Sequence, residues 1–181
     1  MSHALQKIII TGGPGSGKSS IIEKLMEKKY HCLPESGRAI IQDQVCIGGH
    51  ALPWMNKQAF AEMMLCWELR SWHLADNHGG LCFFDRGLPD IEGYLHLCEI
   101  SIPKHIERAI NTFQYAKTVF IASPWRDIYV QDTERKQTFD EAIMTYHAMV
   151  DTYKKYHYEL IEIPHLPVNE RVDFILSVLN S

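Results

Sequence analysis

The sequence predicts an α/β fold in which a parallel sheet of five strands is covered by helices on both faces. Five short apolar segments with strand character alternate along the chain with amphipathic helical patterns, which is typical of parallel sheets. The first strand segment, residues 5–11, contains three consecutive isoleucines and ends in a glycine cluster. A continuous apolar run of this kind is expected for a central strand that is buried on both faces.

Length and composition limit the classes of protein to which the chain can belong. The 181 residues predict one domain, residues 1–181, with 46% hydrophobic and 22% charged residues, as in ordinary globular proteins. A net charge of −4 provides no overall positive field for nucleic acid or an anionic membrane. No segment approaches the ~18 apolar residues of a membrane span, and no signal-peptide pattern opens the chain. We therefore expect a cytoplasmic protein with no membrane span and no nucleic-acid partner.

The first third of the chain predicts two strands and two helices. After the strand at 5–11, apolar residues recur at helical spacing through residues 17–29, with charged residues on the opposite face. The short strand at 31–33 ends at Pro34, and residues 37–47 form a helix that runs into a glycine pair.

The middle of the chain predicts the longest helix and two further strands. The helix begins after Asn56, a good N-cap residue, and ends before another glycine pair. Residues 81–84 form a third apolar strand that is terminated by Asp85. Pro103 suits the first position of the next helix, and residues 118–122 form the fourth strand.

The last part of the chain begins with a capping box formed by Thr138 and Glu141, which opens a helix with an apolar stripe reaching Tyr153. Residues 158–163 form the fifth strand, and Pro167 opens the final helix.

The pattern G-x-x-x-x-G-K-[ST] lies between the first strand and the first helix, which is the context that this phosphate-binding motif requires. Its glycines allow backbone amides to curl around phosphate oxygens, and the helix N-terminus adds further donors and partial positive charge. The residues expected to bind the nucleotide are Gly12, Gly13, Pro14, Gly15, Ser16, Gly17, Lys18, Ser19 and Ser20.

Four side chains are candidates to bind the negatively charged phosphates or their magnesium ion. Lys18 provides a positive charge to the β- and γ-phosphates, and the Ser19 hydroxyl is a candidate magnesium ligand. Asp85, at the carboxyl end of a buried strand, is the second candidate ligand, while Arg86 can reach substrate or phosphate. The alternative role of Asp85 is to cap a neighbouring turn. ATP and Mg²⁺ are therefore the expected cofactors.

Motif absences disfavour two classes of nucleotide-binding protein. A GTPase should contain N-K-x-D or T-K-x-D, and neither string occurs. An AAA+ motor should carry Asp-Glu after the apolar strand, whereas Asp85 is followed by Arg86. Phosphoryl transfer to a small acceptor requires positive charge, a positioned carboxylate and a lid, and the sequence contains candidates for all three.

A lid is predicted at residues 123–138, after the fourth strand and at the same edge of the sheet as the motif. Its cations Arg126, Arg135 and Lys136 are expected to close onto the triphosphate. The alternative is a solvated charged helix in which neighbouring carboxylates neutralise these cations.

Glu35, directly after the second strand, is the carboxylate best placed to accept the proton of an acceptor hydroxyl. The alternative is an exposed N-cap of the following helix. Arg38, one turn further on, is expected to face the same edge of the sheet. The acceptor is expected between Glu35, Arg38, Asp85, Arg86 and the long helix after Asn56.

Four sequence blocks together resemble a known family. They are the motif beginning at Thr11, Pro34-Glu35, Phe83-Phe-Asp-Arg-Gly-Leu-Pro-Asp90 and Tyr129-Val-Gln-Asp-Thr-Glu-Arg-Lys-Gln-Thr-Phe139. From Lys7 to about Leu179, the chain resembles the P-loop ATPases labelled AAA domain, which are grouped with the ribosylnicotinamide kinase domain of the NadR regulator. A wider similarity is to nucleoside and nucleotide kinases.

The resemblance implies a three-layer α/β/α P-loop NTPase fold with strand order 2-3-1-4-5. It also implies that Glu35 approaches the acceptor hydroxyl and that Asp85 and Arg86 form the acidic-arginine pair after strand three. The same resemblance implies that lid cations correspond to Arg126, Arg135 and Lys136. It does not imply hexamer or unfoldase mechanics.

We therefore expect a phosphotransferase that moves the γ-phosphoryl group of Mg-ATP to a small hydroxyl- or phosphate-bearing acceptor, such as a nucleoside-like compound. Two alternatives stay open. A plain nucleoside-triphosphate hydrolase would use water as the acceptor, whereas a nucleotide-dependent switch would hydrolyse slowly and signal to a protein or lipid partner. The sequence leaves open the acceptor, the preference for ATP over GTP and the oligomeric state.

Overall fold

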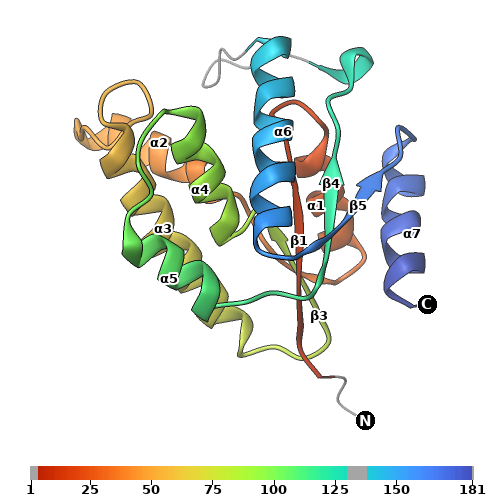
Figure 1. Cartoon of the computed structure of the whole chain (residues 1–181). Helices are drawn as coiled ribbons and strands as arrows, with labels where there is room; N and C mark the ends of the chain where they lie inside the picture. The colour runs from red at the N-terminus through yellow and green to blue at the C-terminus, as the bar shows by residue number, and fades with distance from the viewer. Residues whose placement is uncertain (1–3, 130–137, 181) are drawn as a thin grey trace.

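The computed structural model describes residues 4–129 and 138–180, which contain a five-stranded sheet of order β2-β3-β1-β4-β5 (Figure 1). All neighbouring strands are parallel. The strands are β1 (Gln6–Gly12), β2 (His31–Leu33), β3 (Leu81–Asp85), β4 (Thr118–Ala122) and β5 (Glu159–Ile163). The predicted α/β class and strand order are therefore confirmed.

Helices cover both faces of the sheet (Figure 1). On one face lie α1 (Lys18–Glu27) and α7 (Val168–Leu179). The other face is covered by α3 (Lys57–Ala75), α4 (Leu88–Leu97), α5 (Lys104–Thr112) and α6 (Phe139–Lys155). Helix α2 (Ser36–Ile47) packs beside α3 in a smaller apolar cluster.

The central strand β1 is buried on both faces because its side chains alternate between the two helical layers. Ile9 packs in the layer of α3 to α6, while Ile8 and Ile10 pack in the layer of α1 and α7. All three side chains are fully buried. This packing explains why β1 is a continuous apolar run.

Two helices differ from the prediction, one in its existence and one in its first residue. Helix α4 was not predicted, because it contains Pro89 and Gly93 and most of its residues are buried, so that it shows no amphipathic pattern. Pro103 is the N-cap of α5 and not its first helical residue. The expected caps Asn56 and Thr138 are confirmed, since each side chain accepts a hydrogen bond from a backbone amide of its helix.

Helices α4 and α6 are joined by buried polar contacts as well as by close packing. The Tyr153 hydroxyl donates to Asp90 Oδ2 at 2.5 Å. Lys155 Nζ and the Tyr156 hydroxyl donate to the fully buried carboxylate of Glu92 at 2.6 and 2.5 Å. A buried carboxylate is tolerated only where donors surround it, so these bonds determine how α6 lies on α4.

Removing one of these donors should destabilise the fold. Tyr153→Phe should lower the free energy of unfolding by about 1–3 kcal/mol, because the buried Asp90 carboxylate loses a donor. Urea unfolding of the variant and the parent protein measures this difference. The control is Tyr146→Phe, whose hydroxyl makes only an exposed 3.5 Å contact with Glu162. Equal losses in the two variants would contradict the prediction.

Candidate active site

The phosphate-binding motif forms a tight loop between β1 and α1. Gly12 has φ of +136° and Gly17, the N-cap of α1, has φ of +80°. A side chain at Gly12 would collide with the Ala122 carbonyl of β4. The positive φ therefore favours glycine at both positions, and the close approach of β4 also requires it at Gly12.

Lys18 lies buried across this loop. Its Nζ donates to the Gly13 carbonyl at 2.6 Å and to Ser16 Oγ at 3.3 Å. Ser16 Oγ in turn donates to the same Gly13 carbonyl at 2.8 Å. These two hydrogen bonds hold the ammonium group against the loop, where it can interact with an anion.

A cavity of about 410 Å³, which we call the loop cavity, opens over the motif. Residues 14–20 line it, together with Glu35, Arg38 and Arg171. Gly12 and Gly13 are buried at the start of the loop and do not line the cavity. The volume falls in the range of about 300–1,000 Å³ that is typical of small-molecule sites.

Arg171 of α7 is a loop-cavity residue that the sequence analysis missed. It is 3% exposed, and its Nη2 donates to the Ser16 carbonyl at 3.0 Å. Burial lowers the pKa of Arg171 from its ordinary value. No local pattern marks this residue, because it occupies a core-facing position of an apolar helix and approaches the motif only in the folded chain.

Asp85 lies at the end of β3, opposite Ile10 of β1 and thus beside the motif strand. Its side chain is 4% exposed, and its Oδ1 is buried with no hydrogen-bond partner among the described residues. Burial and, after it, the Glu35 charge raise the pKa of Asp85 to about 6 against the opposing effects of Lys18 and Arg86. The carboxylate is therefore poorly compensated by the protein.

Arg86 connects three parts of the site. Its Nε donates to Glu35 Oε1 at 3.1 Å, and its Nη1 donates to the Gly12 carbonyl and to Asp90 Oδ1, both at 3.0 Å. Burial alone would lower the pKa of Arg86, but the surrounding carboxylates raise it. The backbone of Arg86 has φ of +76°, an uncommon conformation for a side chain with a Cβ.

Asp90 holds Arg86 in place and was given no role in the sequence analysis. Besides Arg86 Nη1 and the Tyr153 hydroxyl, its carboxylate accepts hydrogen bonds from Thr11 Oγ1 at 2.6 Å and from the Gly87 amide at 3.1 Å. Donors from β1, the turn after β3 and α6 therefore meet on one side chain. In the sequence, the one feature that could have indicated a role for Asp90 is its position in the block 83–90, which resembles a known family.

Glu35 is the N-cap residue of α2 by backbone position, but its side chain does not cap the helix. It forms the ion pair with Arg86, and its side chain is 13% exposed. The alternative of an exposed cap is therefore wrong, because the side chain pairs with an arginine that lies 51 residues later in the chain.

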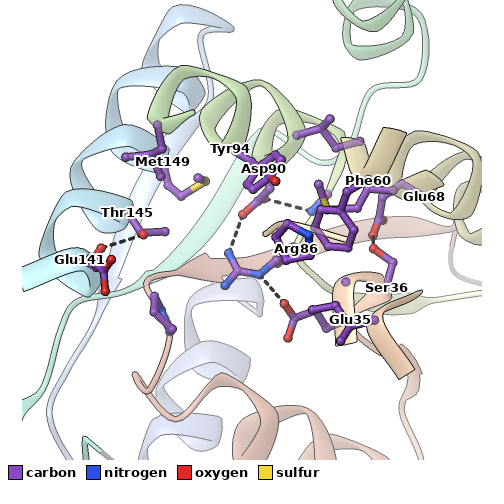
Figure 2. A pocket seen from close by; sticks show the side chains of 18 of the residues that line it. Glu35, Ser36, Phe60, Glu68, Arg86, Asp90, Tyr94, Glu141, Thr145 and Met149 are labelled. Atoms are coloured by element: carbon purple, nitrogen blue, oxygen red, sulfur yellow. Dashed lines mark hydrogen bonds and ion pairs between the residues drawn. The ribbon is translucent and has the colours of Figure 1, made fainter. Parts of the chain in front are cut away.

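A second cavity of about 410 Å³, the helix cavity, lies between α2, α3, α4 and α6 (Figure 2). Its apolar lining includes Phe60, Met64, Tyr94 and Met149. Figure 2 shows Arg86 between the pair Ser36–Glu68 on one side and Glu141 and Thr145 on the other. Both cavities are lined by Pro14 and Glu35, so they meet at the motif.

The predicted lid is described in part. Arg126, on the short 3₁₀ turn Arg126–Ile128, is exposed and lies 4.3 Å over the Phe139 ring, and it lines neither cavity. Ile128 and Tyr129 do line the loop cavity. Arg135 and Lys136 lie outside the described residues.

Comparison with known families gives one match over most of the chain. The model of a family described as AAA domain matches residues 7–171. The chain belongs to this AAA domain family. No curated protein matches the sequence. The expected family is therefore confirmed.

Solved structures similar to this AAA domain include nucleoside and nucleotide kinases. Deoxyadenosine kinase from M. mycoides with bound dATP is 17% identical with a TM-score of 0.66, over 97% of this chain and 100% of that chain. Thymidylate kinase from Ehrlichia chaffeensis is 15% identical with a TM-score of 0.65, over 97% and 99%. Thymidylate kinase from Candida albicans is 11% identical with a TM-score of 0.72, over 99% and 93%. These likenesses establish a shared P-loop kinase fold.

In the part of the chain that the structure describes, we find no helix with both the length and the apolar character needed to cross a bilayer.

The raised pKa of Asp85 predicts a pH-dependent cost to stability. Its pKa is about 6 in the fold against an ordinary 3.8, so the ionised side chain destabilises the protein above pH 6. Asp85→Asn should therefore raise the melting temperature on the order of 5 °C at pH 7. As the pH falls from 6 to about 4, this gain should disappear, because the parent protein then holds the proton.

Thermal unfolding between pH 4 and pH 8 measures this effect, and Asp151→Asn on the exposed side of α6 is the control. A gain that is absent at pH 7, or that is constant across the range, would show that Asp85 carries no buried-charge penalty.

Proposed function

We propose that the chain is an ATP-dependent phosphotransferase that moves the γ-phosphoryl group of Mg-ATP to the hydroxyl of a small, nucleoside-like acceptor. The observation that carries this proposal is the meeting of two cavities at the phosphate-binding loop. The loop cavity suits a polyphosphate, because it combines backbone amides, the Lys18 ammonium and the N-terminus of α1. The helix cavity provides a separate site for an acceptor, which a simple hydrolase does not need.

Glu35 is suited to receive the proton of the acceptor hydroxyl. It lines both cavities, and Arg86 holds its carboxylate in position at 3.1 Å. A general base has to lie at the boundary between donor and acceptor, because the attacking oxygen must approach the γ-phosphorus. Arg86, with its Nη1 also at the Gly12 carbonyl, provides positive charge beside the path of the transferred group.

Two side chains fit a magnesium ion. The Oδ1 atom of Asp85 is buried with no hydrogen-bond partner among the described residues, and Ser19 lines the loop cavity at the first turn of α1. Oxygen ligands of this kind are what Mg²⁺ prefers. When bound, the ion would neutralise phosphate charge, and Asp85 and Ser19 would hold it beside the Lys18 ammonium.

Loss of the loop ammonium should abolish turnover. For Lys18→Ala we expect transfer to fall on the order of 100-fold or more, with weaker ATP binding, because Lys18 is the cation of the loop itself, whereas Arg38 and Arg171 line the cavity from α2 and α7. Acceptor-dependent consumption of ATP and calorimetric titration with ATP measure the two effects. Lys24→Ala, on the outer face of α1, should behave like the parent protein. Full ATP consumption by Lys18→Ala would refute the assignment.

Removal of the proposed base should separate chemistry from binding. Glu35→Gln keeps an oxygen that can accept from Arg86, so nucleotide affinity should be unchanged while transfer falls by about 100-fold or more. The exposed Glu23→Gln on α1 is the matched control.

Phosphate release without any acceptor should be measured on the same samples. If transfer by Glu35→Gln equals that of the parent, Glu35 has no role in the mechanism. Steady phosphate release that no acceptor accelerates would instead indicate a hydrolase, and slow hydrolysis with nucleotide-dependent binding of a protein or lipid would indicate a switch.

A further inference from the structure

The charges around the helix cavity restrict what it can bind. Carboxyl groups of Glu35, Glu68, Asp90 and Glu141 line it, whereas Arg86 is the one lysine or arginine among the described lining residues. Even with Glu68 uncharged, three carboxylates face one guanidinium. The remaining lining is largely apolar, which strengthens the repulsion of an added anion.

Arg86, the single cation among the described lining residues, already binds protein groups. Arg86 is bonded to the Glu35 carboxylate, the Asp90 carboxylate and the Gly12 carbonyl, and its side chain is 15% exposed. These bonds use three of the five N–H donors of the guanidinium, so a phosphate group at the remaining nitrogen would share the one positive charge with the Glu35 and Asp90 carboxylates. That arrangement is costly, because negative charges that lie close together in a largely apolar cavity repel one another strongly.

We propose that the helix cavity takes an unphosphorylated acceptor with a ring system, and that Glu68, held by Ser36, hydrogen-bonds the polar edge of that ring. This inference deepens the proposed function and rests on it. The aromatic residues Phe60 and Tyr94 form one apolar wall, with ring centroids 5.5 Å apart and planes at 70°. Walls of this kind favour a flat ring over a polar chain.

Glu68 is the polar group best suited to recognise such a ring. It is 5% exposed, lines the cavity from α3, and accepts a hydrogen bond from Ser36 Oγ at 2.7 Å through its Oε1. Burial and, to a smaller extent, the charges of Asp90, Asp85 and Glu35 raise the pKa of Glu68 to about 8 against the opposing effect of the Ser36 hydrogen bond. Glu68 is therefore mostly the uncharged acid at pH 7, with an O–H group that can donate to a ring nitrogen or carbonyl.

The groups that face Glu68 from the elements packed against it explain this state. They are the hydroxyls of Ser36 and Tyr115 and the carboxylates of Glu35, Asp85 and Asp90, while Arg86 lines the same cavity. The carboxylates among them outnumber the guanidinium, so the surroundings oppose a further negative charge on α3.

Matched acceptors test the inference on the parent protein. The assay follows transfer from ATP with magnesium to nucleosides and to the 5′-monophosphates of the same nucleosides, with products identified by mass spectrometry. We expect kcat/KM for at least one nucleoside to exceed that for its monophosphate on the order of 100-fold. Monophosphates used as well as or better than nucleosides would overturn the inference and leave the phosphotransferase assignment standing.

Variants of Glu68 test the recognition step. Glu68→Gln is neutral and keeps a donor, so its KM for the nucleoside should stay within about threefold of the parent value. Glu68→Leu removes the donor and should raise KM about tenfold with a smaller change in kcat. Glu62→Leu, on the same helix but outside the cavity and bonded to His105, is the control.

The two proposals fail in different ways. If neither nucleosides nor monophosphates are phosphorylated while ATP is bound or hydrolysed, the proposed function fails, and the inference falls with it. If nucleosides are phosphorylated but Glu68→Gln raises KM as much as Glu68→Leu does, then a charged carboxylate is required and the role given to Glu68 is wrong. Thermal unfolding of each variant establishes that it is folded.

Discussion

The structure depends on the buried carboxylate of Asp90, which has to be surrounded by donors if it is to be stable in the interior. Thr11, Arg86, the Gly87 amide and Tyr153 meet this requirement from β1, the turn after β3 and α6. Because these donors come from separate layers, satisfying one charge also aligns the motif strand with the two helices that border the helix cavity. Asp90 is thus a positioning residue that acts through Arg86.

The site retains several arrangements that do not favour stability. Arg86 has a left-handed backbone, the buried Asp85 carboxylate is poorly compensated, and Glu68 is an acid buried near other carboxylates. Each would be destabilising in an ordinary core. Together they place a guanidinium and a buried acid at the helix cavity and an unpaired carboxylate oxygen beside the motif strand.

The scaffold is shared with kinases that act on different acceptors, so the fold alone does not select a substrate. In the proposed function, selectivity comes from the side chains of α2, α3, α4 and α6, which form the walls of the helix cavity. The loop cavity, in contrast, is built mainly from backbone that the motif itself prescribes. In the proposed function, donor binding is therefore a property of the loop, whereas acceptor binding is a property of the helical wall.

The sequence by itself determined the five strands, most of the helices, the phosphate-binding loop and the candidates Glu35, Asp85 and Arg86, because apolar periodicity and a local motif are encoded within short segments. Only the tertiary structure decided that Glu35 pairs with Arg86 and that Asp90, Arg171 and Glu68 belong to the site. Helix α4 escaped prediction since it is buried on nearly all sides. The Glu35–Arg86 pair and the site positions of Asp90, Arg171 and Glu68 arise from contacts between residues far apart in the chain. Such contacts produce no periodic pattern in the sequence.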